Sequence, residues 1–362
     1  MSRERFIKAL CLEEPDRVPL FDFIFNPDIF REVLGHFPPV EAKDWVECSI
    51  KMGLDGLWLP GDSPEGFKLK PGEERGTFYD EWGQKCMATS EKHWPIPYIV
   101  GHPLEDISKL DEYEPPDPHA KGRTRTIKEA IRLAGDELAI FGGVGGPFSN
   151  TAFLTGFTTY FVSLYRNPSA VHKLAKMVTD FYTELGKIFI EAGVDGIFIS
   201  DDFGTDHSLF ISPAHYREFV LPYLRSMVNA FHKRGAFVLL HSDGNINAIL
   251  EEIVGTGIDA LHPLQRRAGM DIAEVKEKFG DKICIIGNVD VTHVLPFGTK
   301  EEIVNQTKEC ISVAAPGGGY VLASDHSLTG ISLERANLMF ETGRKYGKYP
   351  IRIKEGVTNK DE

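Results

Sequence analysis

The sequence predicts an α/β fold of the (β/α)8 barrel class, with an N-terminal helix and an inserted hairpin and loop region around residues 65–120. Three observations lead to this class. Short apolar segments alternate with helical segments eight times along the chain. Most apolar segments are four to six residues long, as buried parallel strands are. Polar residues follow nearly every one of them, as they do at the active-site end of a barrel. A doubly wound sheet shows a similar alternation, and the count of eight favours the barrel.

The composition is that of an ordinary globular enzyme, and we expect one domain over residues 1–362. The formal net charge of −13, from 40 basic and 53 acidic residues, argues against nucleic acid as the main partner. No apolar run approaches 18 residues, so no membrane span is expected, and the charged N-terminal segment is not typical of a signal peptide. Five scattered cysteines without a CxxC pair indicate a reducing cytoplasm and argue against an all-cysteine zinc site.

The predicted elements follow in chain order. The strands are expected at 18–25, 56–61, 138–144, 196–200, 237–240, 260–264, 283–287 and 320–323. The helices are expected at 2–12, 44–51, 124–134, 149–165, 168–193, 213–234, 246–255, 271–279, 300–314 and 332–347. Residues 65–120 interrupt the alternation with a hairpin over 77–89, centred on Gly83, and a segment rich in proline and acid. This insertion would serve as a lid, an oligomer contact or a docking surface.

The most informative stretch is 236–247, AFVLLHSDGNIN, in which an apolar strand ends in His241 and Asp243. Because side chains alternate along a strand, these two residues point the same way. A histidine and a carboxylate placed together can hold a metal ion or transfer protons. The alternative is structural: His241 would be a core histidine, and Asp243 would cap the helix that starts near Asn247.

Other predicted strands also end in polar residues that a barrel would gather at one end. These are Asp62, Asp201, Asp202, His262, Gln265, Asn288, Asp290, Asp325 and His326. Asp62, Asp201 and Asp325 could instead be caps or turn formers. The glycine-rich GGVGGP (142–147) and APGGGY (315–320) do not match a dinucleotide fingerprint, and we interpret both as backbone devices rather than phosphate sites.

Three long segments resemble the uroporphyrinogen decarboxylase superfamily. They are SDDFGTDHSLFISPAHYREFVLPYLRSMVNAFHKRG with the following LLHSDGNI, then GMDIAEVKEKFGDKICIIGNVD, and finally APGGGYVLASDHSLTGISLERANLMFE. The resemblance covers nearly the whole chain and implies a (β/α)8 barrel, commonly dimeric. The family holds two chemistries: cofactor-free decarboxylation of porphyrinogens, and corrinoid-linked methyl transfer that uses zinc.

The resemblance to the decarboxylases is partial. Asp62 stands where they keep a catalytic aspartate that contacts pyrrole NH groups, and His326 stands where they have a histidine. Their arginine-rich N-terminal segment is replaced here by FDFIFNPDIFREV, and their active-site tyrosine falls near Phe153. An octa-anionic porphyrinogen would be held poorly without those arginines, so uroporphyrinogen is disfavoured as substrate.

In the methyltransferase branch, the resemblance implies zinc ligands at His241, Asp243 and His326, where those enzymes have a His-x-Cys pair and a second Cys. A His/Asp/His set remains compatible with an open zinc site. Without thiolates the zinc would be harder and more Lewis-acidic, better matched to an ether or phenolate oxygen than to a thiol. The resemblance therefore favours the O-demethylase methyltransferases.

We therefore predict a cytoplasmic methyltransferase that demethylates a small donor, such as an aryl methyl ether, and passes the methyl group to the Co(I) corrinoid of a partner protein. Asp62, Asp201 and Asp202 would orient the substrate or supply a proton. A homodimer is expected from the family. An aromatic substrate would need flat apolar walls, and these could include Trp58, Trp82 and Trp94. Packing in the core or in the insertion is the more common role of tryptophan. The alternatives are a cofactor-free decarboxylase that uses Asp62 and His326, and a ligand-binding scaffold without catalysis.

Overall fold

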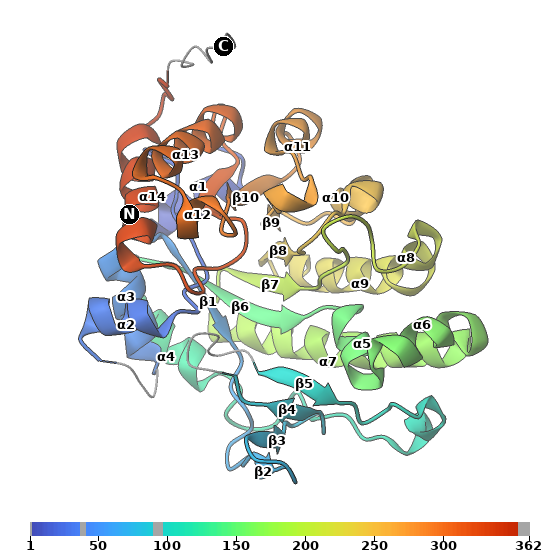
Figure 1. The fold of residues 1–362 in the computed structure, drawn as a ribbon. Helices are drawn as coiled ribbons and strands as arrows, with labels where there is room; N and C mark the ends of the chain where they lie inside the picture. Colours follow the sequence, from blue (N-terminus) through green and yellow to red (C-terminus); the bar gives the residue numbers. More distant parts are fainter. Residues whose placement is uncertain (1, 37–40, 90–96, 354–362) are drawn as a thin grey trace.

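The computed structural model describes residues 2–36, 41–89 and 97–353. Its centre is a curled sheet of seven parallel strands in the order β1-β6-β7-β8-β9-β10-β11 (Figure 1). The bounds of these strands are β1 (Gly56–Pro60), β6 (Ala139–Gly145), β7 (Gly196–Ser200), β8 (Phe237–His241), β9 (Ala260–His262), β10 (Cys284–Val289) and β11 (Tyr320–Ser324). All seven lie at predicted strand positions, and the predicted barrel class is confirmed.

The eighth position of the ring is filled by the extended segment 18–25, the first predicted strand. The Leu322 N–H donates to the Pro19 carbonyl (2.9 Å), and the Phe21 N–H donates to the Leu322 carbonyl (3.0 Å). On the other side, the Asp55 N–H donates to the Leu20 carbonyl (2.8 Å). The pairing is short because Pro19 has no N–H to donate. Beyond it, Asp22 bonds the Ser324 N–H (2.9 Å) and hydroxyl (3.0 Å) through its side chain.

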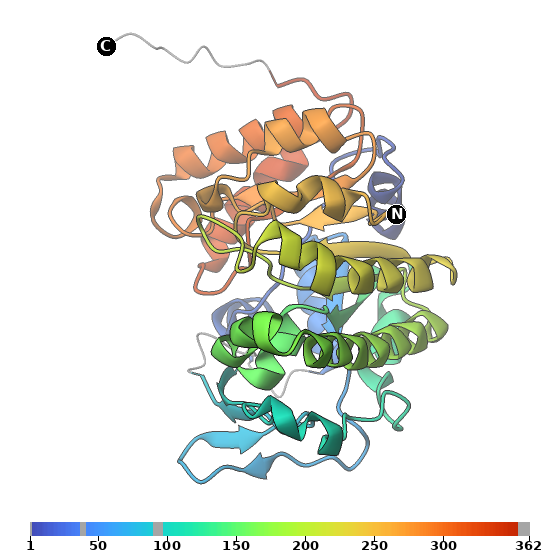
Figure 2. The ribbon, with the colours of Figure 1, turned by 90° about the vertical axis from the view of Figure 1, so that its right-hand side faces the viewer.

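Helices surround the sheet (Figure 2). Their bounds are α1 (Ser2–Leu10), α2 (Pro27–Leu34), α3 (Ala42–Met52), α4 (Arg125–Ala134), α5 (Ser149–Thr155), α6 (Phe157–Arg166), α7 (Pro168–Ala192), α8 (Pro213–Phe219), α9 (Leu221–His232), α10 (Leu250–Val254), α11 (Ile272–Phe279), α12 (Val294–Phe297), α13 (Lys300–Ala314) and α14 (Leu333–Tyr346).

Three predicted helices are each broken into two, and the one expected over 246–255 consists of a 3-10 turn (Asn247–Ile249) followed by α10. The helix expected over 149–165 breaks at Gly156, which has a φ of 77°. The helix expected over 213–234 breaks at Val220, because Pro222 follows and cannot donate a helical hydrogen bond. Helix α2 was not predicted, although its start has a readable signal: the Asn26 side chain caps it, and Pro27 is its first residue.

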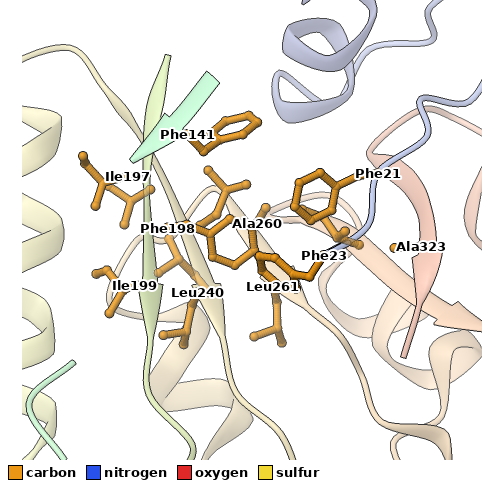
Figure 3. Packing of buried hydrophobic residues seen from close by; sticks show 14 of the residues in the cluster. Phe21, Phe23, Phe141, Ile197, Phe198, Ile199, Leu240, Ala260, Leu261 and Ala323 are labelled. Carbon is orange, nitrogen blue, oxygen red and sulfur yellow. The ribbon is translucent and has the colours of Figure 1, made fainter. Parts of the chain in front are cut away.

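The barrel interior is filled by aromatic side chains (Figure 3). Phe21 and Phe23, from the closing segment, point toward Phe198 on β7, with ring centroids 5.9 and 5.4 Å away. Phe198 points inward, whereas its neighbours Ile197 and Ile199 point to the opposite side of β7, toward the helices. This strict alternation is that of a strand buried on both faces, and it explains the continuous apolar sequence of β7.

The insertion forms a second, antiparallel sheet of four strands. These are β2 (Lys70–Pro71), β3 (Thr77–Tyr79), β4 (Lys85–Met87) and β5 (Tyr98–Gly101). The predicted hairpin around Gly83 is its centre, since β3 pairs with β4. Trp82, at the hairpin turn, packs on Phe181 (4.7 Å between ring centroids) and Tyr182 (5.7 Å) of α7. This contact holds the insertion against the barrel.

Asp55, which is fully buried before β1, joins three parts of the chain at the point of closure. Its carboxylate accepts hydrogen bonds from Arg5 of α1 (2.6 Å), from Arg17 (2.7 Å) and from the Leu20 N–H (2.8 Å). A carboxylate without solvent needs such partners, and the two guanidinium groups need it in turn.

We expect Asp55→Ala to lower the free energy of unfolding by about 3 kcal/mol, because it leaves two partly buried guanidinium groups without their shared anion. Chemical denaturation measures this. The matched control is Asp16→Ala, which removes an exposed partner of the same Arg5 and should cost less than about 1 kcal/mol. Equal costs for the two variants would contradict the role assigned to Asp55.

Candidate active site

The site candidate lies where β7 and β8 end, and it brings together three of the predicted residues. His241 Nε2 lies 3.5 Å from Asp202 Oδ1 and 3.7 Å from Asp243 Oδ2. The Asp243 N–H also donates to Asp202 Oδ1 (3.0 Å). One ligand atom from each of the three residues lies within 4.8 Å of the others. The parallel pairing of β7 with β8 sets this arrangement, because Ser200 and His241 are in register and the chain turns outward just beyond them.

His326, the third predicted ligand, follows β11 and lies beside the group rather than within it. Its Nε2 contacts Asp243 Oδ2 at 3.0 Å, and its Nδ1 lies 2.9 Å from the Ser327 hydroxyl. Burial opposes protonation of this imidazole, but the hydrogen bond and charge of Asp243 outweigh it and raise the pKa of His326 to about 9. Burial alone would raise the pKa of Asp243, but the charge of His241 and bonds from both imidazoles lower it.

The donor set fits a zinc ion. Ligands of a tetrahedral zinc site lie about 3.4 Å apart, given metal–ligand distances near 2.1 Å. The separations of 3.5 and 3.7 Å around His241 Nε2 are close to this value. In addition, Asp243 Oδ1 is buried and has no hydrogen-bond partner within the described residues. A carboxylate oxygen in that state is a candidate ligand atom. His241, Asp243 and Asp202 would hold the ion, and His326 would hold Asp243.

His262, on β9, supports His241 from behind. The Nδ1 atoms of the two rings are 2.7 Å apart, so one nitrogen donates and the other accepts. His262 is fully buried against Phe21, Phe23 and Phe198, and this burial lowers its pKa well below the usual value. A neutral His262 that accepts at Nδ1 fixes one proton of His241 on Nδ1, so Nε2, the atom that faces the carboxylates, would be the one to lose its proton and bind a metal ion. The sequence predicts that His262 lies at the end of a strand, but it does not predict the contact with His241.

Two other predicted residues have their carboxylates engaged elsewhere. Asp201 is 1 % exposed and accepts the N–H groups of Phe148 (3.0 Å) and Ser149 (2.6 Å) at the start of α5. Burial raises its pKa to about 7. Asp62 accepts the Thr126 N–H (2.8 Å) and hydroxyl (2.6 Å) in the first turn of α4. Both carboxylates therefore make capping contacts with a helix, which was the structural alternative to a catalytic role. The assignment of Asp62 and Asp201 as catalytic residues stays a prediction.

A cavity of about 380 Å³ adjoins the group and shares Asp202 with it. Its lining comes from the ends of β1, β6 and β7, from the insertion, and from α7. Five aromatic residues line it, namely Trp58, Trp82, Phe153, Phe181 and Tyr182. For Trp58 and Trp82 the sequence favoured packing over a wall, and both roles are seen, since both line the cavity while Trp82 packs the insertion on α7. Trp94 lies outside the described residues. Arg123, Glu81 and Tyr182 were not predicted, because no sequence spacing links the insertion and α7 to the barrel end.

The glycines of β6 create this space. A Cβ on Gly143 would lie 2.4 Å from Trp58 Nε1, and a Cβ on Gly145 would lie 2.3 Å from Asn150 Nδ2. Both distances are well inside van der Waals contact, so only glycine lets these side chains approach the strand. This is in keeping with the interpretation of GGVGGP as a backbone device.

Comparison with known proteins identifies the family. A family model described as "Uroporphyrinogen decarboxylase (URO-D)" matches residues 87–346. The chain belongs to this family. The family resemblance predicted from the sequence is confirmed, whereas the extent of one domain over 1–362 stays a prediction.

The similar proteins include both chemistries of the family. "Methylcobamide:CoM methyltransferase MtbA" of Methanosarcina acetivorans is 30% identical over 337 residues, covering 88% of this chain and 92% of the relative. Uroporphyrinogen decarboxylase of Myxococcus xanthus is 26% identical over 338 residues, covering 91% and 88%. The predicted enzyme class is confirmed: the chain is an enzyme, and the methyltransferase assignment is supported ahead of the carboxy-lyase. The comparisons support corrinoid-linked methyl transfer at this coarse level.

Among solved structures, a methyltransferase from Methanosarcina mazei superposes with a TM-score of 0.74 at 20% identity, covering 95% of this chain and 98% of that one. At this identity the likeness establishes the fold. None of the described helices is both long and apolar enough to span a membrane.

We expect substitution of Asp201 to affect stability, and substitution of Asp202 to affect metal binding. Asp201→Ala removes the acceptor of two buried N–H groups and should lower the free energy of unfolding by about 2 kcal/mol. Asp202→Asn, its neighbour, should leave stability within about 0.5 kcal/mol but lower metal affinity. Urea denaturation and metal titration of both variants check this. A stable Asp201→Ala variant would contradict the capping role.

We expect the loss of His262 to weaken metal binding at His241 by about 10- to 100-fold, because the acceptor that orients the imidazole is removed. His262→Leu keeps the volume without the acceptor, and His262→Asn restores an acceptor near the Nδ1 position and should recover part of the affinity. The measurement is a competition titration with a chromophoric chelator. Unchanged affinity in His262→Leu would refute the orienting role.

Proposed function

We propose that the protein is a corrinoid-linked methyltransferase that takes a methyl group from an oxygen of a small donor, an aryl methyl ether, and delivers it to the Co(I) corrinoid of a separate protein. The observation that carries the proposal is the convergence of Asp202, His241 and Asp243 beside an aromatic-lined cavity. The similarity to methylcobamide:CoM methyltransferases supports the corrinoid partner.

The ligand chemistry supports an oxygen rather than a sulfur substrate. None of the five cysteines belongs to the candidate metal group, and four of them are buried elsewhere. Nitrogen and carboxylate donors leave zinc harder than thiolate donors do. When bound, zinc would serve as a Lewis acid that stabilises negative charge on the departing oxygen.

The protein's own residues supply the rest of the site. His262 orients His241 through Nδ1, and His326 fixes Asp243 through Nε2. The five aromatic residues supply apolar walls for a ring, and Asp202 lies where the cavity adjoins the metal-ligand group. The carboxy-lyase alternative receives less support, because Asp62, which it needs as the pyrrole-binding carboxylate, is bonded to Thr126 of α4.

Three further expectations accompany the proposal: a corrinoid protein as partner, a homodimer, and a cytoplasmic location. The first is supported by the names of the relatives. The homodimer is expected from the family resemblance, and the cytoplasmic location from the scattered cysteines. They are tested by co-purification with a corrinoid protein, by light scattering, and by fractionation.

We expect the untagged protein to bind about one zinc per chain. His241→Ala and Asp243→Asn should lose the metal and lower methyl transfer from methoxyphenols to Co(I) corrinoid by at least about 100-fold. The matched control is His293→Ala, an exposed histidine that likewise lies near an aspartate, Asp290 at 3.4 Å. Metal is measured by mass spectrometry and transfer by the loss of the Co(I) absorbance. A wild-type protein that takes up no zinc, or a fully active His241→Ala variant, would refute the proposal.

A further inference from the structure

We infer that the cavity selects an uncharged, single-ring methoxyarene and discriminates against the same ring bearing a carboxylate. This inference rests on the proposed function and narrows the chemical class of the donor. It follows from the charges around the cavity, from the state of its guanidinium group, and from its size and walls.

Among the described residues that line the cavity, no positive charge is left unpaired. Asp62, Glu81 and Asp202 contribute carboxylates, and Arg123 is the one cation among the described lining residues. A divalent ion at the neighbouring group would be balanced by Asp202 and Asp243, so it would not add a cation that an anionic ring could use. A substrate carboxylate would therefore lose its hydration without gaining an unpaired positive partner.

Arg123 is already neutralised. Its Nη1 donates to Glu81 Oε1 (2.7 Å), and its Nη2 donates to the Asp117 carbonyl (2.7 Å). The side chain is only 3 % exposed and lies over the Phe181 ring, 5.5 Å from its centroid. A guanidinium fixed in this way cannot turn to form the bidentate pair by which arginine recognises carboxylates.

The cavity also carries neutral polar groups. Its lining includes the hydroxyl and amide side chains of Ser63, Ser149, Asn150 and Ser200. Phenol and ether oxygens can accept hydrogen bonds from such groups, and a phenol O–H can donate to them.

The size and walls of the cavity favour one ring. A volume of about 380 Å³ lies near the lower end of the range for small-molecule sites, which is roughly 300–1,000 Å³. Trp82, Phe181 and Tyr182 form one cluster of rings, with centroids 4.7 to 5.7 Å apart. Trp58, which also lines the cavity, is supported by Phe23 and Phe25, which pack on it from outside the lining. Flat apolar walls of this kind suit a planar ring.

The test compares ligands that share one ring and differ in charge: 2-methoxyphenol, 4-hydroxy-3-methoxybenzoate and 4-hydroxy-3-methoxybenzylammonium. Binding to the zinc-supplemented full-length protein is measured by quenching of tryptophan fluorescence and by calorimetry. We expect 2-methoxyphenol to bind at least about tenfold more tightly than the benzoate. Equal or tighter binding of the benzoate, or no binding of any of the three, would overturn the inference.

A second experiment frees the Arg123 guanidinium from its partner Glu81. Glu81→Gln keeps the shape of the side chain and removes its charge, so the benzoate should gain about tenfold in affinity while 2-methoxyphenol changes less than about twofold. The matched control is Glu74→Gln, which removes an exposed carboxylate of the same insertion that pairs with Lys85 (3.1 Å) and should change neither affinity. An unchanged benzoate affinity in Glu81→Gln would also overturn the inference.

The two proposals fail in different ways. Methyl transfer to Co(I) from the benzoate but not from 2-methoxyphenol would overturn the inference and leave the proposed function standing. Binding in the expected order, with no transfer from any methoxyarene, would overturn the proposed function and leave the charge selectivity of the cavity standing.

Discussion

The closure of the barrel at Asp55 is the contact on which the rest of the structure depends. This buried carboxylate joins α1, Arg17 and the extended segment at Leu20, where backbone pairing is too short to hold the ring alone. Closure places Phe21 and Phe23 inside the barrel, where Phe23 packs edge-on against both His241 (5.8 Å) and His262 (5.1 Å). The segment that closes the barrel therefore also packs on both imidazoles of the candidate site.

The register of the parallel strands then determines what the site contains. Gly145, Ser200, His241 and His262 are successive register partners on β6 to β9, so they lie side by side on one face of the sheet. At one end of this row Gly145 lets Asn150, which lines the cavity, approach the strand, and at the other end the two imidazoles are paired. The cavity and the metal-ligand group therefore adjoin, and Asp202, two residues beyond Ser200, belongs to both.

The sequence predicts the strands, the hairpin and the cluster around His241, because each of these has a local signal: an apolar run, a turn glycine, a polar residue directly after a strand. It does not predict which carboxylate faces inward. Asp201 and Asp202 are adjacent and chemically identical, yet the alternation of side chains sends one to the start of α5 and the other to His241. Arg123 and Glu81 had no signal at all, since their pairing depends on how the insertion packs on α7.

The placement of the cysteines adds a last physical argument. The chain keeps four thiols in its buried interior, where burial raises the pKa of Cys48 to about 12 and that of Cys86 to about 11. None of the five cysteines belongs to the candidate metal group. The candidate metal group instead has a carboxylate at Asp243, held by His326, with one oxygen that lacks any partner among the described residues. An oxygen and nitrogen donor set beside an aromatic cavity is consistent with chemistry at a carbon–oxygen bond, and it is this pairing that distinguishes the site from one built to bind a thiol.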